Sequence, residues 1–197
     1  TIEEWFKIVF EEETSNPMHY AKHLFVLDDL GEWIEPTSII VEDGINKIKE
    51  GMFRNLSMLR EITLPASLSQ ILANAFYNCL NLEHVYFEGT FEEWKNIYIE
   101  NEDANPMKYA TKFYLLNEAN EWYELTELTI DGTNKVINSY QYYGYEIIQN
   151  LSILNGIENI EYYAFGDCIN LLTLELPATI TRISSNAFGN CNSLDSV

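Results

Sequence analysis

Apolar residues recur along this chain in a short pattern, L-x-x-I-x-L, with clear copies in "LREITLP" (59–65) and "LLTLELP" (171–177). Such alternation is typical of a β-strand with one buried face, so positions one, four and six are predicted to point inward and positions three and five outward. The fourth position falls at Ile39, Ile62, Val85, Leu128, Leu151, Leu174 and Val197. Every step between them is 23 residues, except the 43 residues from Val85 to Leu128.

A second motif, A-F-x-x-C-x-x-L, overlaps the start of several strands. It is written as "AFYNCLNL" (75–82), "AFGDCINL" (164–171) and "AFGNCNSL" (187–194). This segment is predicted to be the turn that closes a coil, with its Phe and Cys filling stacked interior columns. Leu56 takes the Cys position of a degraded copy, and Tyr142 and Tyr145 take the Phe and Cys positions of another. Both tyrosines are therefore predicted to belong to the core.

The one longer step contains a 20-residue insertion, and its sequence is a second copy of the start of the chain. Residues 1–35 align with 90–124 without a gap, and 16 of the 35 positions are identical. We therefore expect one domain over residues 1–197 that is internally duplicated. Its units are 1–89, 90–178 and part of a further repeat, 179–197.

Each copy of the insertion has its own predicted elements. Thr1-x-x-Glu4 and Thr90-x-x-Glu93 are capping boxes, each of which predicts the start of a short helix. The apolar side of these helices is predicted to carry Trp5, Ile8, Trp94 and Ile97. The Asn-Pro-Met segments predict a further helical turn. Residues 23–27 and 112–116 are predicted strands, each followed by a turn (27–33 and 116–122). The insertion is thus expected to be a helical bulge plus a hairpin strand on one flank, serving either packing or binding.

A period of 23 lies in the range of leucine-rich repeats, in which one unit buries its apolar face only against its neighbours. The repeats, with the Trp-containing insertion, resemble the BspA-like leucine-rich-repeat family over essentially the whole chain. The resemblance implies an α/β fold: a right-handed solenoid with one continuous parallel concave sheet, short convex turns or helices, and an inserted helix-hairpin element. It also implies a surface or secreted protein that functions in adhesion and host or protein binding, and no enzymatic activity.

The concave sheet is the extended surface that a solenoid offers to a partner. Its outward third and fifth positions give the candidate ligand-binding residues Glu61, Thr63, His84, Tyr86, Glu127 and Thr129. Seven strands would make a face about 30 Å wide, which suits a protein or peptide. We therefore expect a non-enzymatic protein-binding or adhesion module. The alternative is a structural spacer or stalk whose parent protein binds elsewhere.

The formal net charge of −20 changes the choice of partner. It repels phosphate backbones and anionic lipids, so neither nucleic acid nor a membrane surface is expected as a partner. No apolar run approaches the roughly 18 residues of a membrane span. The expected partner is a protein or peptide, with a host surface protein or glycan as possibilities, and the expected location is secreted or at the cell surface. We also expect the chain to be a piece of a longer repeat array, with its first and last strands least ordered.

Candidate catalytic and metal chemistry was examined residue type by residue type. Cys79, Cys168 and Cys191 do not form a zinc or disulfide pattern and are predicted to be free thiols in the core. His19 and His23 share one helical face but lack the glutamate of a zinc motif, so they are predicted to be exposed polar residues. No cofactor, metal or catalytic residue is expected. In "SYQYYGY" (139–145), Tyr140 and Tyr143 are predicted to face solvent, where they could stack against a glycan or peptide.

Overall fold

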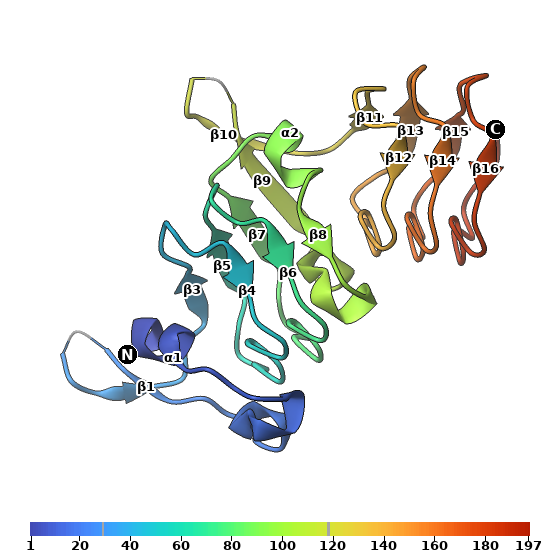
Figure 1. Cartoon of the computed structure of the whole chain (residues 1–197). Helices are drawn as coiled ribbons and strands as arrows, with labels where there is room; N and C mark the ends of the chain where they lie inside the picture. The colour runs from blue at the N-terminus through green and yellow to red at the C-terminus, as the bar shows by residue number, and fades with distance from the viewer. Residues whose placement is uncertain (29, 118) are drawn as a thin grey trace.

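The computed structural model describes residues 1–28, 30–117 and 119–197, and it shows a β-solenoid with parallel sheets and few, short helices (Figure 1). Asp29 and Glu118, within the two predicted turns, lie outside the described residues. The α-helices are α1 (Ile2–Lys7) and α2 (Phe91–Trp94), and the 3-10 helices are η1 (Glu13–Ser15), η2 (Pro17–His19), η3 (Glu102–Ala104) and η4 (Pro106–Lys108).

The strands are short and follow the repeat. They are β1 (Val26–Leu27), β2 (Trp33–Ile34), β3 (Ser38–Ile40), β4 (Lys47–Ile48), β5 (Glu61–Leu64), β6 (Gln70–Ile71), β7 (His84–Phe87), β8 (Tyr98–Ile99), β9 (Lys112–Leu116), β10 (Trp122–Glu124), β11 (Leu128–Ile130), β12 (Val136–Ile137), β13 (Asn150–Ile153), β14 (Asn159–Ile160), β15 (Thr173–Glu175) and β16 (Arg182–Ile183).

The coils form two stacks, which Figure 1 shows side by side. Within the described residues, the first stack has a five-stranded sheet in the order β10-β9-β7-β5-β3 and a three-stranded sheet, β4-β6-β8. The second stack has two three-stranded sheets, β11-β13-β15 and β12-β14-β16. Strands β1 and β2 pair with each other as an antiparallel hairpin.

The parallel register confirms the 23-residue period, and it also shows what the insertion does. Ile39 pairs with Ile62, and Ile62 with Val85. Val85 then pairs with Phe113, 28 residues later, while β8 pairs with β6 on the other side of the coil. The second insertion therefore provides a coil of its own, on top of β6 and β7, because both of its strands continue existing sheets.

The insertion also ends the first stack, so the prediction of one continuous parallel sheet is wrong. Strand β10 folds back antiparallel on β9, with Trp122 opposite Leu116, and it occupies the edge of the five-stranded sheet. The next repeat strand, β11, pairs with β13 and starts a new sheet. The repeat pattern could not show this break, because the antiparallel strand lies within the sequence that interrupts the pattern.

The interior columns hold the predicted aromatic residues. The rings of Tyr142, Phe165 and Phe188 lie one above the next with centroids 5.1 Å apart, a spacing close to that of neighbouring β-strands. Tyr142 and Tyr145 are fully buried, which confirms that they belong to the core. Each cysteine thiol donates to a backbone carbonyl in the neighbouring coil, as Cys79 Sγ does to Phe53 O over 3.0 Å.

The two helices begin as the capping boxes predict. The hydroxyls of Thr1 and Thr90 accept hydrogen bonds from the backbone N–H groups of Glu4 and Glu93, whose side chains return the contact. The apolar side of α2 is buried, and Trp94 is 0% exposed. Around α1 the burial is weaker, and Ile8 is exposed, contrary to the prediction.

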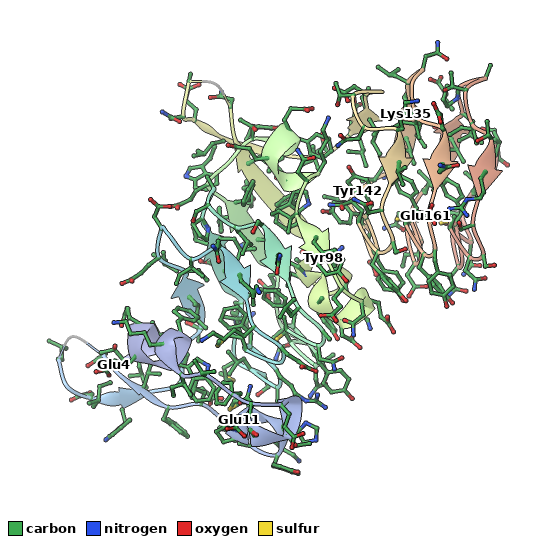
Figure 2. The ribbon with its side chains drawn as sticks, viewed as in Figure 1. Glu4, Glu11, Tyr98, Lys135, Tyr142 and Glu161 are labelled. Carbon is green, nitrogen blue, oxygen red and sulfur yellow. The ribbon has the colours of Figure 1, made fainter. Side chains whose placement is uncertain are left out.

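Side chains of the second insertion also contact the second stack. Trp94 Nε1 donates to the hydroxyl of Tyr145 over 2.6 Å, and Asn105 Nδ2 donates to the carbonyl of Tyr140 over 3.0 Å. The ring of Phe91 lies 6.3 Å from that of Tyr142. Figure 2 shows Tyr142 at the edge of the second stack that is nearest to α2 and β8. The insertion is therefore packed against both stacks.

Candidate functional site

Four of the predicted binding residues lie together on the outer face of the five-stranded sheet. Glu61 pairs with His84 across β5 and β7, and Thr63 pairs with Tyr86. On both strands the residues at positions two and four are buried and those at positions one and three are partly exposed. The alternation expected of a strand thus places these four side chains on one surface, in two columns.

The second insertion extends both columns by one strand. Lys112 pairs with His84, and Tyr114 pairs with Tyr86. Strand β10 then adds Trp122 and Glu124 at the edge of the sheet. We call the surface formed by His84, Tyr86, Tyr114 and Trp122 the aromatic face.

The rings of the aromatic face contact one another. Tyr86 and Tyr114 stack with centroids 4.8 Å apart and planes 12° apart, and Trp122 meets Tyr86 edge-on at 5.4 Å. The imidazole of His84 lies 6.1 Å from the ring of Tyr114. Cross-strand aromatic pairs of this kind stabilise a sheet by roughly 0.5–1.5 kcal/mol each and restrict the rings to one arrangement. Trp122 nevertheless remains 46% exposed, so the surface is both ordered and open to solvent.

Charged groups border the rings. Glu61 Oε1 lies 3.1 Å from His84 Nδ1, and Lys112 Nζ lies 3.5 Å from Glu124 Oε2. Partial burial, and then the charge of Glu61, raise the pKa of the Tyr86 hydroxyl above its usual value. The phenol is therefore neutral at physiological pH and can donate a hydrogen bond. Exposed ion pairs of this type contribute little to stability, which leaves their charges available to a partner.

The remaining two predicted residues lie elsewhere. Thr129 is on β11, and Glu127 immediately precedes that strand, so both belong to the second stack. The equivalent column there continues through Ser152 and Glu175, whose side chains are joined by a 3.0 Å hydrogen bond. This surface has small polar side chains where the first stack has aromatic rings, because β10 separates the two sheets.

Sequence reasoning missed Lys112, Tyr114, Trp122 and Glu124 as parts of the surface. The segment 112–116 was predicted as a strand, but it stands 28 residues after β7, so the 23-residue period did not align it with the columns. The duplication carried a signal that could have found it. The first copy has Phe25 and Trp33 at the positions of Tyr114 and Trp122.

The first hairpin repeats this arrangement away from the five-stranded sheet. Phe25 and Trp33 are exposed. His23 Nδ1 lies 2.9 Å from Glu35 Oε1, where the second copy pairs Lys112 with Glu124. An exposed aromatic pair beside a base–acid pair is therefore a property of both hairpins.

Other candidate chemistry has no assembled site. In the part of the chain that the structure describes, no three His, Cys, Asp or Glu side chains converge as metal ligands would. Burial raises the pKa of the Cys79 thiol to about 12, so this group is protonated and unreactive. Among the same residues, none of the helices has the length and apolar character needed to span a bilayer.

Comparisons with known proteins agree with this architecture. The family model of the BspA type leucine rich repeat region matches residues 32–104 and 115–197, in 6 copies. A comparison with curated proteins found no match.

Two solved structures are similar to the chain. A leucine rich cell surface protein of Faecalibacterium prausnitzii A2-165 has a TM-score of 0.52 and 20% identity, with 89% of this chain and 53% of that chain covered. A leucine-rich repeat protein of Bacteroides ovatus ATCC 8483 has a TM-score of 0.51 and 20% identity, with 81% and 36% covered. Both likenesses show the fold, and the chain spans about half or less of each solved chain.

Proposed function

Since the chain belongs to the BspA-type leucine-rich repeat family, we propose that it is a non-enzymatic binding or adhesion module whose aromatic face contacts a protein or peptide. Leucine-rich repeat modules generally mediate protein binding, and an extended sheet is the surface that such solenoids offer. The proposal assigns contact roles to Glu61, Thr63, His84 and Tyr86 together with Tyr114 and Trp122.

The observation that carries the proposal is the ordered, exposed stack of Tyr86, Tyr114 and Trp122. Tyr and Trp are enriched among the residues that contribute most to protein interfaces. Their rings supply large contact areas at low entropic cost, and here the sheet already restricts them. Five strands spaced about 4.8 Å apart give a face about 19 Å wide, which is enough for a peptide or a small protein epitope.

Charge and likeness to known proteins support the class of partner and the location. The formal net charge of −20 favours a partner with basic groups and disfavours nucleic acid. The similar Faecalibacterium chain is a cell surface protein. We extend this location to the present chain, which would then contact host or neighbouring-cell proteins from the cell surface or after secretion.

The proposal treats residues 1–197 as one internally duplicated binding unit, with the helix-hairpin element of 90–124 as part of its surface. The second stack favours a further role. Its outer column, Thr129, Ser152 and Glu175, has no aromatic ring. This supports a spacer function for residues 128–197, which would hold the aromatic face at a distance from the rest of a longer assembly.

A protein and peptide array tests the proposal. We expect the wild-type chain to bind a subset of the array, and the Tyr86→Ala, Tyr114→Ala and Glu61→Lys variants to lose that binding. Thr129→Ala is the matched control on the second stack and should bind as the wild type does. Circular dichroism and thermal melts must show that each variant is folded. Binding that is equal in all folded variants would place the site elsewhere.

A further inference from the structure

A second aromatic surface lies on the turns of the second stack. Its members, the tyrosine cluster, are Tyr140, Tyr143, Tyr162 and Tyr163. Tyr140 and Tyr163 are parallel to within 6° with centroids 6.0 Å apart, and Tyr162 meets both rings edge-on at 5.8 and 4.6 Å. Tyr143 contacts Tyr140 and Tyr163 at 6.1 and 5.9 Å. Tyr143 is only 7% exposed, so the prediction that it faces solvent is wrong, whereas Tyr162 is 42% exposed.

The backbone beneath two of these tyrosines is in an unfavourable conformation. Tyr140 and Tyr163 have φ values of 60° and 53°, in the left-handed region. At the same position of the coil, other repeats have the residues that tolerate this region best: Gly51, Asn74 and Asn186, with φ between 55° and 60°. A bulky residue there costs about 1–2 kcal/mol relative to glycine. Packing alone does not explain this cost, because three coils close the same turn without a tyrosine.

The neighbouring coil positions make room for the rings and hold them. A Cβ atom on Gly166 would lie 2.4 Å from the Tyr163 ring and 2.9 Å from the Tyr143 ring, so any larger residue would displace them. The hydroxyl of Tyr143 donates to Asp167, which also accepts a 2.6 Å hydrogen bond from Asn190. The cluster is therefore built from three consecutive coils and fixed in place.

The corresponding place in the first stack indicates what such rings can bind. The duplication aligns Tyr143 with Arg54 and Gly166 with Tyr77. There the guanidinium of Arg54 lies over the ring of Tyr77, 4.3 Å from its centroid. In the second stack a cation also approaches the cluster, since Lys108 Nζ lies 5.8 Å from the Tyr143 ring. Both stacks thus bring a cation to a tyrosine at this turn.

Negative charge adds to the attraction for cations. Asp167 contacts the cluster directly, and Glu102 is near enough to raise the pKa of Tyr140 after the larger effect of burial. The chain as a whole carries −20. Aromatic rings attract ammonium and guanidinium groups by about 0.5–2 kcal/mol each, and nearby carboxylates reinforce that attraction.

We propose that the tyrosine cluster is a second interaction site, which binds arginine or lysine side chains of a basic segment in a partner protein. The site is separate from the aromatic face and does not depend on the function assigned to that face. The exposed ring of Tyr162 would meet the cation first, and the strained Tyr140 and Tyr163 would hold Tyr162 edge-on for that contact.

The repeats supply variants that test the site without changing the charge of the chain. Tyr163→Asn and Tyr140→Gly install the residues that other coils use at this position, so both should fold and melt at or above the wild-type temperature. Fluorescence anisotropy with a labelled hexaarginine peptide measures binding. We expect the double variant, and separately Tyr162→Ala, to bind several-fold to about thirtyfold more weakly. Tyr98→Asn, at an exposed tyrosine on β8 outside both surfaces, should bind hexaarginine as the wild type does (Figure 2).

Three results would overturn the proposal. Unchanged hexaarginine binding in the folded double variant would show that the peptide responds only to overall charge. A lower melting temperature of the double variant would assign the cluster to packing. Glycan binding that Tyr162→Ala abolishes, with hexaarginine binding intact, would make the cluster a carbohydrate site. Variants of the aromatic face leave this measurement unaffected, so the two proposed sites can fail independently.

Discussion

At the level of single residues, the contact between the two stacks depends on a buried hydrogen bond. The indole N–H of Trp94 donates to the hydroxyl of Tyr145 over 2.6 Å, and both side chains are fully buried. Removal of either group leaves a buried polar atom without its partner, which is costly. The tyrosine that replaces a cysteine in this interior column thus has a partner that a thiol at the same place would not reach.

The first prediction concerns this pair. Trp94→Phe should lower the free energy of unfolding by about 2–4 kcal/mol, because it removes buried volume and leaves the Tyr145 hydroxyl unpaired. Trp5→Phe is the matched control. Trp5 donates to the exposed end of a looser contact, the carbonyl of Met52 at 3.1 Å in a partly buried place, so it should cost about 1 kcal/mol. Urea unfolding measures both, and equal losses would contradict the role of the Tyr145 contact.

A second prediction follows from the ion pairs of Lys95. Its buried side chain contacts Glu92 and lies 2.9 Å from Asp131. Hydrogen bonds from Thr133, and then from Lys95, lower the pKa of Asp131 from 3.8 to about 2. A carboxyl group whose pKa is depressed on folding stabilises the protein above its unfolded pKa, and this contribution is lost as the pH falls through the folded value.

Asp131→Asn should therefore destabilise the protein at pH about 6 by on the order of 1 kcal/mol, allowing for the partial exposure of the carboxylate. The difference between variant and wild type should shrink between about pH 4 and pH 2. Urea unfolding at several pH values measures it. A difference that stays constant down to pH about 2 would show that the charge of Asp131 does not contribute.

At the level of elements, the insertion is a coil that closes one sheet and contacts the next stack. Its second 3-10 turn, η4, is fixed by Asn105, whose carbonyl oxygen accepts from Met107 N at 3.0 Å and whose amide donates to the Tyr140 carbonyl. The first copy repeats this, since Asn16 accepts from Met18 N at 2.9 Å and donates to the Gly51 carbonyl at 2.8 Å. One asparagine therefore both caps a turn and joins the insertion to the following repeat.

We predict that Asn105→Ala lowers the free energy of unfolding by about 2–3 kcal/mol, the sum of a lost cap and an unpaired buried carbonyl. Asn105→Asp keeps the capping oxygen but cannot donate to Tyr140, so it tests the joining contact separately and should also destabilise. Thermal melts measure both variants. If Asn105→Asp is as stable as the wild type, the contact with Tyr140 contributes nothing.

The elements were predictable where the physics is local. Capping boxes set the helix starts, and the alternation of L-x-x-I-x-L set the strand faces, so Glu61, Thr63, His84 and Tyr86 were placed correctly on one surface. What failed depends on how distant segments meet. The antiparallel return of β10 separates Glu127 and Thr129 from that surface, and no local pattern encodes this pairing. Tyr143 was misplaced because its burial depends on Gly166, one coil away.

At the level of the whole molecule, the charge imbalance opposes the compact state. The chain has 31 acidic and 11 basic side chains of Asp, Glu, Lys and Arg, and most of its ion pairs are exposed and contribute little. Repulsion among like charges destabilises a folded protein and is screened by salt. We therefore predict that the melting temperature rises by several degrees between about 0.01 M and about 1 M NaCl. A fall over this range, followed by differential scanning calorimetry, would mean that attractive ion pairs dominate.

The division into an aromatic first stack and a polar second stack is the central feature of this account, because it assigns partner binding to one end of the solenoid. The most direct measurement is the affinity of a partner, selected on the protein and peptide array, for the wild type and for folded Tyr86→Ala and Thr129→Ala variants, determined by calorimetric titration. We predict that Tyr86→Ala weakens binding at least tenfold, which corresponds to about 1.4 kcal/mol, and that Thr129→Ala leaves it unchanged. Loss of affinity in Thr129→Ala with full affinity in Tyr86→Ala would contradict the account.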